Sequence, residues 1–480
     1  MALRSPQQYR QSLRDGRTVY YKGQRVEDVT EHSELRLAVK HASIDYEMAE
    51  SPEYRDLAVY QEDGESFSRY YKIPRSSDDL LLRSRLIETA TALGGTLVVL
   101  IKEIGTDGLF ALHLVAHEMD QRLGTQYLDR VQRFYHYARE NDFGVSVAQT
   151  DVKGDRSLGP REQEHPDYYV HIVDETPEGI IVRGAKVHTS VSINTNEVIV
   201  LPTRNMSEAD RDYAVAFALP LNTKGLKLIT SAYGAHHDDR PFDFPLASQH
   251  RMVETLTVFD DVLVPHDRVF LKGEWPFAGE LAKTFVEFHR FTAISYKLPL
   301  VDALVGAALL MVEYNGIERA KHVQEKLSRL ISYAETLRAL VRLAAIDCHS
   351  GPLGIAIPNT LLVNMAKLHF ATNYHQALAY VQDITGGLIV TGPGEADLAN
   401  PETGPLIERY LGGRRGVSAT NRLKAINLVK ELTATDFAGY QAVLAIHAEG
   451  SIEAEKLAMV REHDSARCKT YVKRLAGIED

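Results

Sequence analysis

Two side chains that can move protons share one face of a predicted helix. The segment "FHRFTAISYKL" (288–298) places His289 and Tyr296 seven positions apart, which is two helical turns and therefore one face. A neutral imidazole takes or gives a proton near neutral pH, and a tyrosine hydroxyl beside it can donate a hydrogen bond. A single helical histidine is more often a packing residue, so the pair favours acid–base chemistry only modestly.

A second polar group stands at the end of a predicted strand, "VRGAKVHTS" (182–190). Strand alternation is expected to place Lys186 and His188 on one face and Val187 and Thr189 on the other. This pattern fits a ligand-facing strand end and an edge strand with a polar face about equally well.

A charged loop, "TDVKGDRS" (150–157), joins a helical zone to a β-rich zone. Gly154 permits close approach of the backbone to a ligand, and backbone N–H groups beside Lys153 and Arg156 suit a phosphate or an anionic ring. On these local features alone, a solvated connection is the simpler interpretation.

A glycine-rich turn follows a long predicted helix in "QDITGGLIVTGPGEADL" (382–398). Gly386 and Gly387 are expected to end that helix. No GxGxxG follows a predicted strand anywhere in this segment, so a Rossmann or P-loop nucleotide site is excluded here.

Three zones must position these groups. Residues 1–144 have mainly helical spacing, interrupted at Gly94–Gly95. Residues 145–278 hold short β-branched runs punctuated by turns, which predict a small antiparallel sheet or barrel. Residues 279–480 return to the helical period. The predicted fold class is therefore α+β, with a β-domain inserted between an N-terminal helical domain and a C-terminal helical bundle.

Composition narrows the classes of function. The 480 residues carry a formal net charge of -11, which argues against a nucleic-acid binder. The two cysteines, Cys348 and Cys468, form no CxxC, so neither a disulfide framework nor a thiolate metal site is expected. The start has no apolar leader, and no later run was expected to span a membrane, so a cytoplasmic protein is predicted.

The four segments, in this order, resemble one superfamily, that of 4-hydroxyphenylacetate 3-monooxygenase oxygenase components and 4-hydroxybutyryl-CoA dehydratase. The resemblance is carried by "DVKGDRSLGPREQEHPDYYVHIVDETPEGIIVRGAKVHTSVSIN", "ETLTVFDDVLVPHDRVFLKGE", "HRF" and "QDITGGLIVT". It implies an acyl-CoA-dehydrogenase-like fold, with FAD between the β-domain and the C-terminal helices. It also implies a homodimer or homotetramer in which a neighbouring subunit completes each site.

By similarity, a set of residues would line the flavin. Its members in one chain are Gln149, Asp151, Lys153, Gly154, Asp155, Arg156, Ser157, His188 and Thr189. Gly386 and Gly387 are expected to contact a flavin across a subunit interface.

The resemblance fails at the metal ligands. The dehydratase holds an iron–sulfur cluster with three cysteines and one histidine, and the alignment places Val99, Glu103 and Tyr296 at the cysteine positions and His289 at the histidine. Positions 99 and 103 are expected on one helix face, as paired ligands would need. Since valine cannot ligate a metal, no cluster is expected, and the three positions become candidate substrate contacts.

The phenol-binding residues of the hydroxylases are also missing. Their arginine, tyrosine and histidine find no match, and Val147 stands where the histidine would fall. A substrate other than 4-hydroxyphenylacetate is therefore expected, paired with Glu103, His289 or Tyr296.

Two catalytic functions follow from the resemblance. The first is a two-component monooxygenase that receives reduced FAD from a separate reductase, with His289 as acid or base and Tyr296 as a hydrogen-bond donor. The second is a cluster-free isomerase, dehydratase or dehydrogenase acting on an acyl-CoA-like thioester. There His289, Glu254 and a C-terminal carboxylate, Glu449 or Glu453, would act, since proton removal beside a thioester needs only a base and an oxyanion stabiliser.

A third possibility is a flavin-free scaffold that kept the fold. The presence of Arg156, His188, Thr189 and His289 argues weakly against it.

Overall fold

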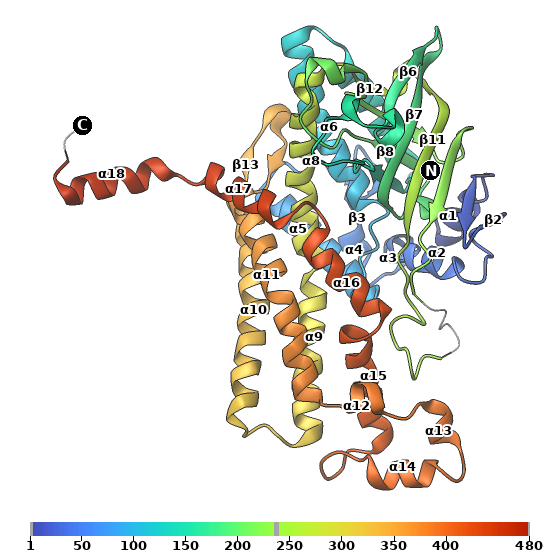
Figure 1. The fold of residues 1–480 in the computed structure, drawn as a ribbon, viewed down its shortest axis with the longest axis vertical. Coiled ribbons are helices and arrows are strands. Elements are labelled where there is room, and N and C mark those ends of the chain that lie inside the picture. Colours follow the sequence, from blue (N-terminus) through green and yellow to red (C-terminus); the bar gives the residue numbers. More distant parts are fainter. Residues whose placement is uncertain (1–2, 235–239, 479–480) are drawn as a thin grey trace.

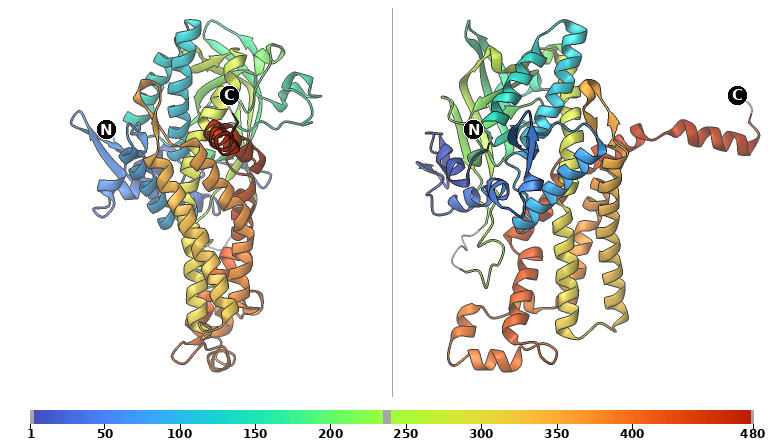
Figure 2. Two further views of the ribbon diagram at one scale, coloured as in Figure 1. Left: turned by 90° about the vertical axis from the view of Figure 1, so that its left-hand side faces the viewer. Right: turned by 180° about the vertical axis from the view of Figure 1, so that it is seen from behind.

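The protein folds into sheets flanked by helices, with a long helical bundle extending below them (Figures 1 and 2). The structure, a computed structural model, describes residues 3–234 and 240–478. The α+β class and the order of helices, strands and helices agree with the prediction from the sequence.

The N-terminal part consists mainly of helices. They are α1 Pro6–Ser12, α2 Arg36–Ala42, α3 Ile44–Glu50, α4 Arg55–Ala58, α5 Ser77–Leu93, α6 Glu103–Leu123 and α7 Tyr127–Glu140. α5 begins where the Ser76 side chain accepts a hydrogen bond from the Asp79 N–H, and it ends at Gly94, as the glycine pair predicted. Four short strands lie among these helices: β1 Val19–Tyr21, β2 Gln24–Val26, β3 Val59–Glu62 and β4 Glu65–Ser68.

Two sheets form the centre of the molecule. The strands of the middle zone are β5 Val145–Ala148, β6 His171–Glu175, β7 Gly179–Ser190, β8 Glu197–Val200, β9 Val215–Pro220, β10 Leu226–Thr230, β11 Glu254–Pro265 and β12 Val269–Lys272. One sheet has the order β2-β1-β10-β11-β7-β6 and the other β12-β9-β8-β5. β1 pairs with β10, and β5 with β8, in parallel, so the sheets are not wholly antiparallel as expected.

The C-terminal part is helical. Its helices are α8 Trp275–Tyr296, α9 Leu298–Asn315, α10 Lys321–Ile346, α11 Thr360–Thr385, α12 Leu388–Thr391, α13 Glu395–Ala399, α14 Gly404–Tyr410, α15 Ala419–Thr433, α16 Asp436–His447, α17 Ile452–Glu462 and α18 Ser465–Ala476, with a small hairpin of β13 His349–Ser350 and β14 Ala356–Ile357. The predicted domain boundary at 278/279 falls inside α8, which begins at Trp275.

Two hydrophobic cores hold the chain together. The N-terminal helices and both sheets share the first core, to which α6, β11 and α8 contribute Phe110, Phe259 and Phe288. The second core lies within the helical bundle, around residues such as Leu337 and Phe370. The middle zone therefore does not bury a core of its own, and α8 passes from the first core into the second.

The expectation that no segment could span a membrane needs a correction. Trp275–Asn315, which comprises α8 and α9, is long and apolar enough by length and composition, with a mean hydropathy of 1.5. Two-thirds of its most apolar window, 67%, is buried inside the fold, which is the pattern of core helices.

The C-terminal end leaves the body of the molecule. α18 projects away from the bundle and the sheets, as Figures 1 and 2 both show, and it buries none of its residues. Tyr471, Val472 and Leu475 on this helix are 58–68% exposed.

Candidate active site

His289 and an aspartate of a neighbouring helix form the first part of the site. On α8, the His289 Nδ1 lies 3.1 Å from an Asp107 Oδ2 on α6. The other Asp107 oxygen accepts hydrogen bonds from Arg83, at 2.7 Å, and from the Thr292 hydroxyl, at 3.0 Å. An aspartate held by an arginine is ionised, so Nδ1 of His289 carries the proton and donates it.

This arrangement fixes what the histidine can do. With Nδ1 donating to Asp107, Nε2 is the His289 nitrogen left to take or give a proton, and it makes no hydrogen bond to a described residue. The ring stacks on Phe285, with centroids 5.2 Å apart and planes inclined by 11°. His289 is therefore an oriented base in a nearly dry setting, 8% exposed.

Tyr296 belongs to a buried charged cluster. Its hydroxyl donates to Glu449, which lies in the turn between α16 and α17. Lys297 and Lys367 place their ammonium groups 3.1 and 3.6 Å from the same carboxylate. Burial alone would raise the pKa of Glu449, but the charges of these lysines and of His289 hold it at about 2. Glu449 is thus ionised, and burial lowers the pKa of Lys297 to about 8.

The backbone of this turn is unusual. Glu449 has φ +58 and Gly450 has φ +104. The Arg290 guanidinium donates to the Glu449 carbonyl at 2.8 Å, and a Cβ at Gly450 would lie 2.5 Å from an Arg290 nitrogen. The glycine and the arginine together hold the carboxylate against Tyr296.

Glu254, at the start of β11, is the second buried carboxyl. One oxygen accepts hydrogen bonds from the Tyr440 hydroxyl, at 2.7 Å, and from Ser190, at 3.1 Å. The other oxygen is buried and has no partner among the described residues. Burial raises the pKa of Glu254 to about 7, and the two hydroxyl donors limit that rise. A carboxyl with this pKa can exchange protons at neutral pH.

These parts form one site. Burial, followed by the charges of Glu449, Glu254 and Asp107, raises the pKa of Tyr296 well above its usual value. Glu449 therefore contacts the Tyr296 hydroxyl, and Glu254 and Asp107 are close enough for their charges to act on it. The structure brings together all three candidate catalytic residues, His289, Tyr296 and Glu254.

The charged loop at 150–157 gathers cations. Lys153 has φ +74 and Gly154 has φ +52. Burial, and then the charges of Arg156 and Arg204, lower the pKa of Lys153. Arg204 donates to the Leu158 carbonyl at 3.2 Å. The charge of Asp151 opposes their effect on Lys153, but Asp151 is itself paired with Lys186, so the cations of this loop still favour an anionic ligand.

Other loop residues shape the loop itself. Asp151 is buried against Lys186, at 2.8 Å, and also accepts from the Val170 N–H. Asp155 accepts hydrogen bonds from both the backbone and the hydroxyl of Ser157. The backbone carbonyl of Gln149 accepts a hydrogen bond from the Lys186 ammonium group at 2.9 Å.

The predicted alternation of β7 is wrong at its end. Lys186 is buried and His188 exposed, although the two were expected on one face. Lys186 pairs with Thr257 and Thr189 pairs with Thr255, so three steps on β7 match two on β11. This β-bulge, with His188 at φ +56, reverses the alternation. Burial, with the charges of Lys153 and His447, lowers the pKa of His188, which places its ring beside the cationic loop.

Val99 and Glu103 do not share a helix face as predicted. Val99 lies in the connection between α5 and α6, and Glu103 is the first residue of α6. Leu100, at φ +65, breaks the helical path between them. Both side chains are fully buried. Burial raises the pKa of Glu103, and burial together with the charge of Glu103 raises the pKa of the neighbouring Asp45 well above its usual value.

Gly386 and Gly387 lie at the end of α11, close to α12 and away from the sheets (Figure 1). In one chain they do not join the site, so the predicted contact with a neighbouring subunit's flavin stays a prediction.

Sequence reasoning missed several members of the site: Arg83, Asp107, Lys297, Lys367 and Tyr440. Lys297 follows Tyr296 directly, and Asp107 lies one helical turn after Glu103, so local spacing could have suggested these two. Tyr440 lies 186 positions from Glu254, and no sequence pattern joins them. Of the two C-terminal carboxylates left open, Glu449 belongs to the site, whereas Glu453 is exposed and pairs with Lys456.

The fold is that of an acyl-CoA-dehydrogenase-like protein, with helices flanking two sheets. The buried acid–base groups lie where the sheets and the bundle meet. Within that class, the chain belongs to the 4-hydroxyphenylacetate 3-hydroxylase family. The model of the family's N-terminal region matches residues 5–271 and that of its C-terminal region residues 278–477.

Both branches of the superfamily are among its relatives. The chain is 32% identical to the 4-hydroxybutyryl-CoA dehydratase/vinylacetyl-CoA-Δ-isomerase of Clostridium aminobutyricum, over 99% of this chain and 100% of that protein. It is 28% identical to the 4-hydroxyphenylacetate 3-monooxygenase oxygenase component of Thermus thermophilus, over 88% and 86%.

Solved structures show the same two branches. An oxygen-tolerant archaeal 4-hydroxybutyryl-CoA dehydratase from N. maritimus superposes with a TM-score of 0.93 at 30% identity, covering 100% of this chain and 96% of that one. The oxygenase component of 4-hydroxyphenylacetate 3-monooxygenase, in complex with FAD and 4-hydroxyphenylacetate, superposes with a TM-score of 0.90 at 26% identity, covering 98% of each.

Proposed function

We propose that the protein is a FAD-dependent enzyme. The observation that carries this is the cationic cluster of Lys153, Arg156 and Arg204, with the neutral ring of His188 beside it, which suits the phosphates of the cofactor. Beside it, the Thr189 hydroxyl is buried and has no partner among the described residues, so a polar ligand atom would satisfy it. Related FAD complexes in the family support the same assignment.

Two groups of residues would contribute to FAD binding in different ways. Lys153, Gly154, Arg156, His188 and Thr189 are proposed as direct contacts. Gln149, Asp151, Asp155 and Ser157 are proposed to act through the shape of the loop, because their polar groups already bond within the protein.

FAD binding has a direct test. Arg156→Ala should lower the amount of FAD retained after gel filtration, measured by the flavin's visible absorbance, while Arg133→Ala on the surface of α7 should not. Equal FAD content in the two variants would contradict the proposed cofactor site.

The first candidate reaction is that of a two-component monooxygenase. The family match, the oxygenase components among the relatives and the FAD-complexed structure support it. FAD, reduced by a separate reductase, would supply the activation of O₂ and the two electrons that reduce its second oxygen atom to water. His289 Nε2 would take a proton from the substrate, and Tyr296 would hold a substrate oxygen.

The second candidate is a double-bond isomerase acting on an acyl-CoA-like thioester. A specific observation favours it: Glu254 has a pKa near neutrality and one buried oxygen without a partner among the described residues, which supports a role as a base. Glu254 would remove a proton beside the thioester carbonyl, and His289 protonated at Nε2 would return one further along the chain. The proton on Glu254 would then pass to His289 before the next turnover. Lys297, whose ammonium group has donors beyond the one facing Glu449, would stabilise the charge on the carbonyl oxygen.

The cysteines of an iron–sulfur cluster are absent from the matching positions, which hold Val99, Glu103 and Tyr296. Within the described residues, no group of three or more His, Cys, Asp or Glu side chains could hold a metal ion. The residues present do not fit a cluster, so no step is assigned to one.

One experiment separates the two reactions. The FAD-loaded protein is given vinylacetyl-CoA without oxygen, and separately a panel of phenols with a flavin reductase, NADH and oxygen. Conversion of vinylacetyl-CoA to crotonyl-CoA supports the isomerase. Oxygen consumption coupled to a hydroxylated product supports the monooxygenase. NADH oxidation that yields only hydrogen peroxide with every phenol, together with isomerisation, would overturn the first candidate.

We further propose a cytoplasmic homodimer or homotetramer. Apolar side chains exposed along the bundle, including Leu309, Ile331 and Leu343 at 41–45%, and the projecting α18 support assembly. In such an assembly, Gly386 and Gly387 of one chain would approach the flavin of another.

A further inference from the structure

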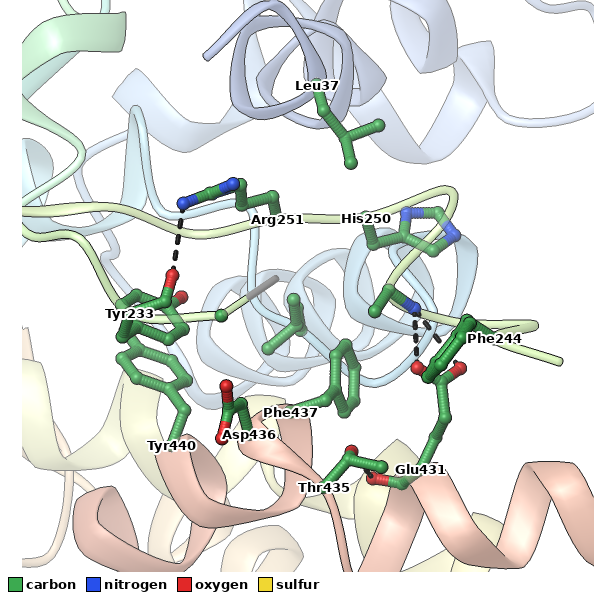
Figure 3. Close-up of a pocket in the computed structure, with 13 residues that line it drawn as sticks. Leu37, Tyr233, Phe244, His250, Arg251, Glu431, Thr435, Asp436, Phe437 and Tyr440 are labelled. Atoms are coloured by element: carbon green, nitrogen blue, oxygen red, sulfur yellow. Dashed lines mark hydrogen bonds between the residues drawn. The ribbon is translucent and has the colours of Figure 1, made fainter. Parts of the chain in front are cut away.

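A cavity lies next to the candidate active site. It has a volume of about 280 Å³ and lies between residues 233–234 and 244–251 on one side and the start of α16 on the other (Figure 3). Apolar side chains from four parts of the chain form much of its lining: Leu37, Leu97, Phe244, Ala247 and Phe437. Its volume is close to the lower end of ligand pockets, which run from about 300 to 1,000 Å³.

A pair of tyrosines joins this cavity to the catalytic carboxyl. Tyr233 and Tyr440 both line it, and their rings stack with centroids 4.8 Å apart and planes inclined by 6°. The Tyr440 hydroxyl donates to Glu254 at 2.7 Å. A molecule in the cavity that contacts Tyr440 is therefore one side chain away from Glu254.

Arg251 supplies the polar character at one end. It is 8% exposed and donates to the Tyr21 hydroxyl and the Tyr233 carbonyl, both at 3.0 Å. Its Nε is buried and has no partner in the part of the chain that the structure describes. An unpartnered buried donor is costly, and a ligand oxygen can remove that cost. Glu34, 3.6 Å from Arg251, already offsets part of its charge.

The remaining polar groups limit the charge of a ligand. Burial, with the charges of His41 and Lys40, lowers the pKa of His250 to about 3, so His250 is neutral. Glu431 accepts hydrogen bonds from the Leu246 and Ala247 N–H groups, and Asp436 is exposed at the start of α16. One partly offset cation facing two carboxyls does not suit a polyphosphate, but it suits one carbonyl or carboxylate.

We propose that this cavity, the tail chamber, binds the non-reacting part of the substrate, a short and mainly apolar chain with one carbonyl or carboxylate oxygen for Arg251. The reacting carbon would then lie at the Tyr440 end, toward Glu254. The inference deepens the proposed function. The role of Glu254 rests on that function, whereas the binding of a chain in the chamber does not.

The test uses a series of straight-chain carboxylates, from butanoate to octanoate, titrated calorimetrically into FAD-loaded protein. If the chain enters the chamber, each added methylene should tighten binding about fourfold until the chamber is full, since burying one contributes about 0.8 kcal/mol. The corresponding alcohols should bind more weakly, because they lack the carboxylate for Arg251.

Two variants change the chamber in opposite directions. Ala247→Trp should fill it and weaken binding of every carboxylate at least tenfold. Phe437→Ala should enlarge it and move the best chain length upward. Val443→Trp, at a position that is 59% exposed on α16, is the matched control and should bind the series like the wild type. FAD absorbance should be retained in all three.

Affinities that do not depend on chain length, failure of the whole series to bind, or equal binding by Ala247→Trp and the wild type would overturn the chamber. A protein that binds the series with the expected length dependence but takes up no FAD would overturn the proposed function alone.

Discussion

At the scale of single residues, the site depends on partners that set the proton positions of its catalytic groups. Asp107 decides which nitrogen of His289 is basic, and Tyr440 holds one oxygen of Glu254 while leaving the other without a partner. Neither residue is proposed to touch the reacting atoms, so both are positioning residues whose effects can be separated from those of the acids and bases themselves.

Asp107→Asn should preserve the fold but lose the fixed tautomer of His289. An amide can donate to Nδ1, which would move the proton to Nε2 and remove the basic lone pair. Turnover should fall about 10²–10⁴-fold with little change in KM, the range for losing one acid–base catalyst. The ¹⁵N spectrum of histidine-labelled protein should show the change of tautomer.

Asp302→Asn, which alters a half-exposed partner of Arg338, is the control and should leave both the spectrum and the turnover unchanged. An Asp107→Asn protein with wild-type turnover would show that His289 is not the base.

Tyr440→Phe should shift the pH dependence of any reaction that uses Glu254 as a base. The pKa of Glu254 is about 7, and a base must be deprotonated, so kcat/KM should rise as the pH increases through that value. The Tyr440 hydroxyl stabilises the charged form, so its removal should move the rise toward higher pH by about one unit.

Tyr333→Phe removes another buried hydroxyl, which donates to the Phe370 carbonyl, and should leave the profile in place. The pH profile of kcat/KM is measured with vinylacetyl-CoA as the substrate. If the rise of kcat/KM with pH is unshifted in Tyr440→Phe, that rise does not report the deprotonation of Glu254.

At the scale of elements, the sequence predicted where helices and strands lie better than how their side chains point. The glycine stops after α5 and α11 and the runs of β7 and β11 were found as expected, because periodicity and breakers are local signals. The bulge at His188 and the turn at Leu100 were not, since each depends on how a distant strand or helix pairs with that segment. These two irregularities account for the misplaced Lys186 and Val99.

Gly450→Ala tests the turn that carries Glu449. The φ of +104 strains any residue with a Cβ, and the added atom would displace the Arg290 guanidinium. The free energy of unfolding should fall by about 1–3 kcal/mol, measured by urea denaturation. Turnover should fall as well, because Glu449 would lose its position against Tyr296.

Gly439→Ala, on α16 with nothing within 4 Å of an added Cβ, is the matched control and should be neutral or stabilising. A Gly450→Ala protein with unchanged stability and turnover would show that this turn does not hold the site.

At the scale of the whole molecule, the order of the three zones along the chain was predictable from the sequence. That the first two zones share one hydrophobic core was not. Residues 1–144 and the sheets share one core, and β1 pairs with β10 across more than 200 positions of sequence, as the register of Val19 with Leu228 shows. Composition and periodicity describe one segment at a time. They therefore divide the chain into zones even where long-range strand pairing joins two zones in one core. The same limit hid Tyr440, whose partner Glu254 lies 186 positions away in the sequence.

The projecting α18 carries a final prediction about assembly. A helix of 12 residues with none of them buried is marginal in water, and Tyr471, Val472 and Leu475 leave an apolar face of α18 exposed. A second copy of this chain is the proposed cover. Replacing Tyr471, Val472 and Leu475 together by glutamine should lower the mass measured by light scattering after gel filtration.

Thr470→Gln, on the opposite side of the same helix, should leave the mass unchanged. If subunits complete one another's flavin sites through Gly386 and Gly387, the triple variant should also retain less FAD, although the acid–base site of each chain stays intact. A triple variant with the wild-type mass would contradict α18 as an assembly element. A dissociated protein that keeps its full FAD content would instead remove the glycine turn from the cofactor site.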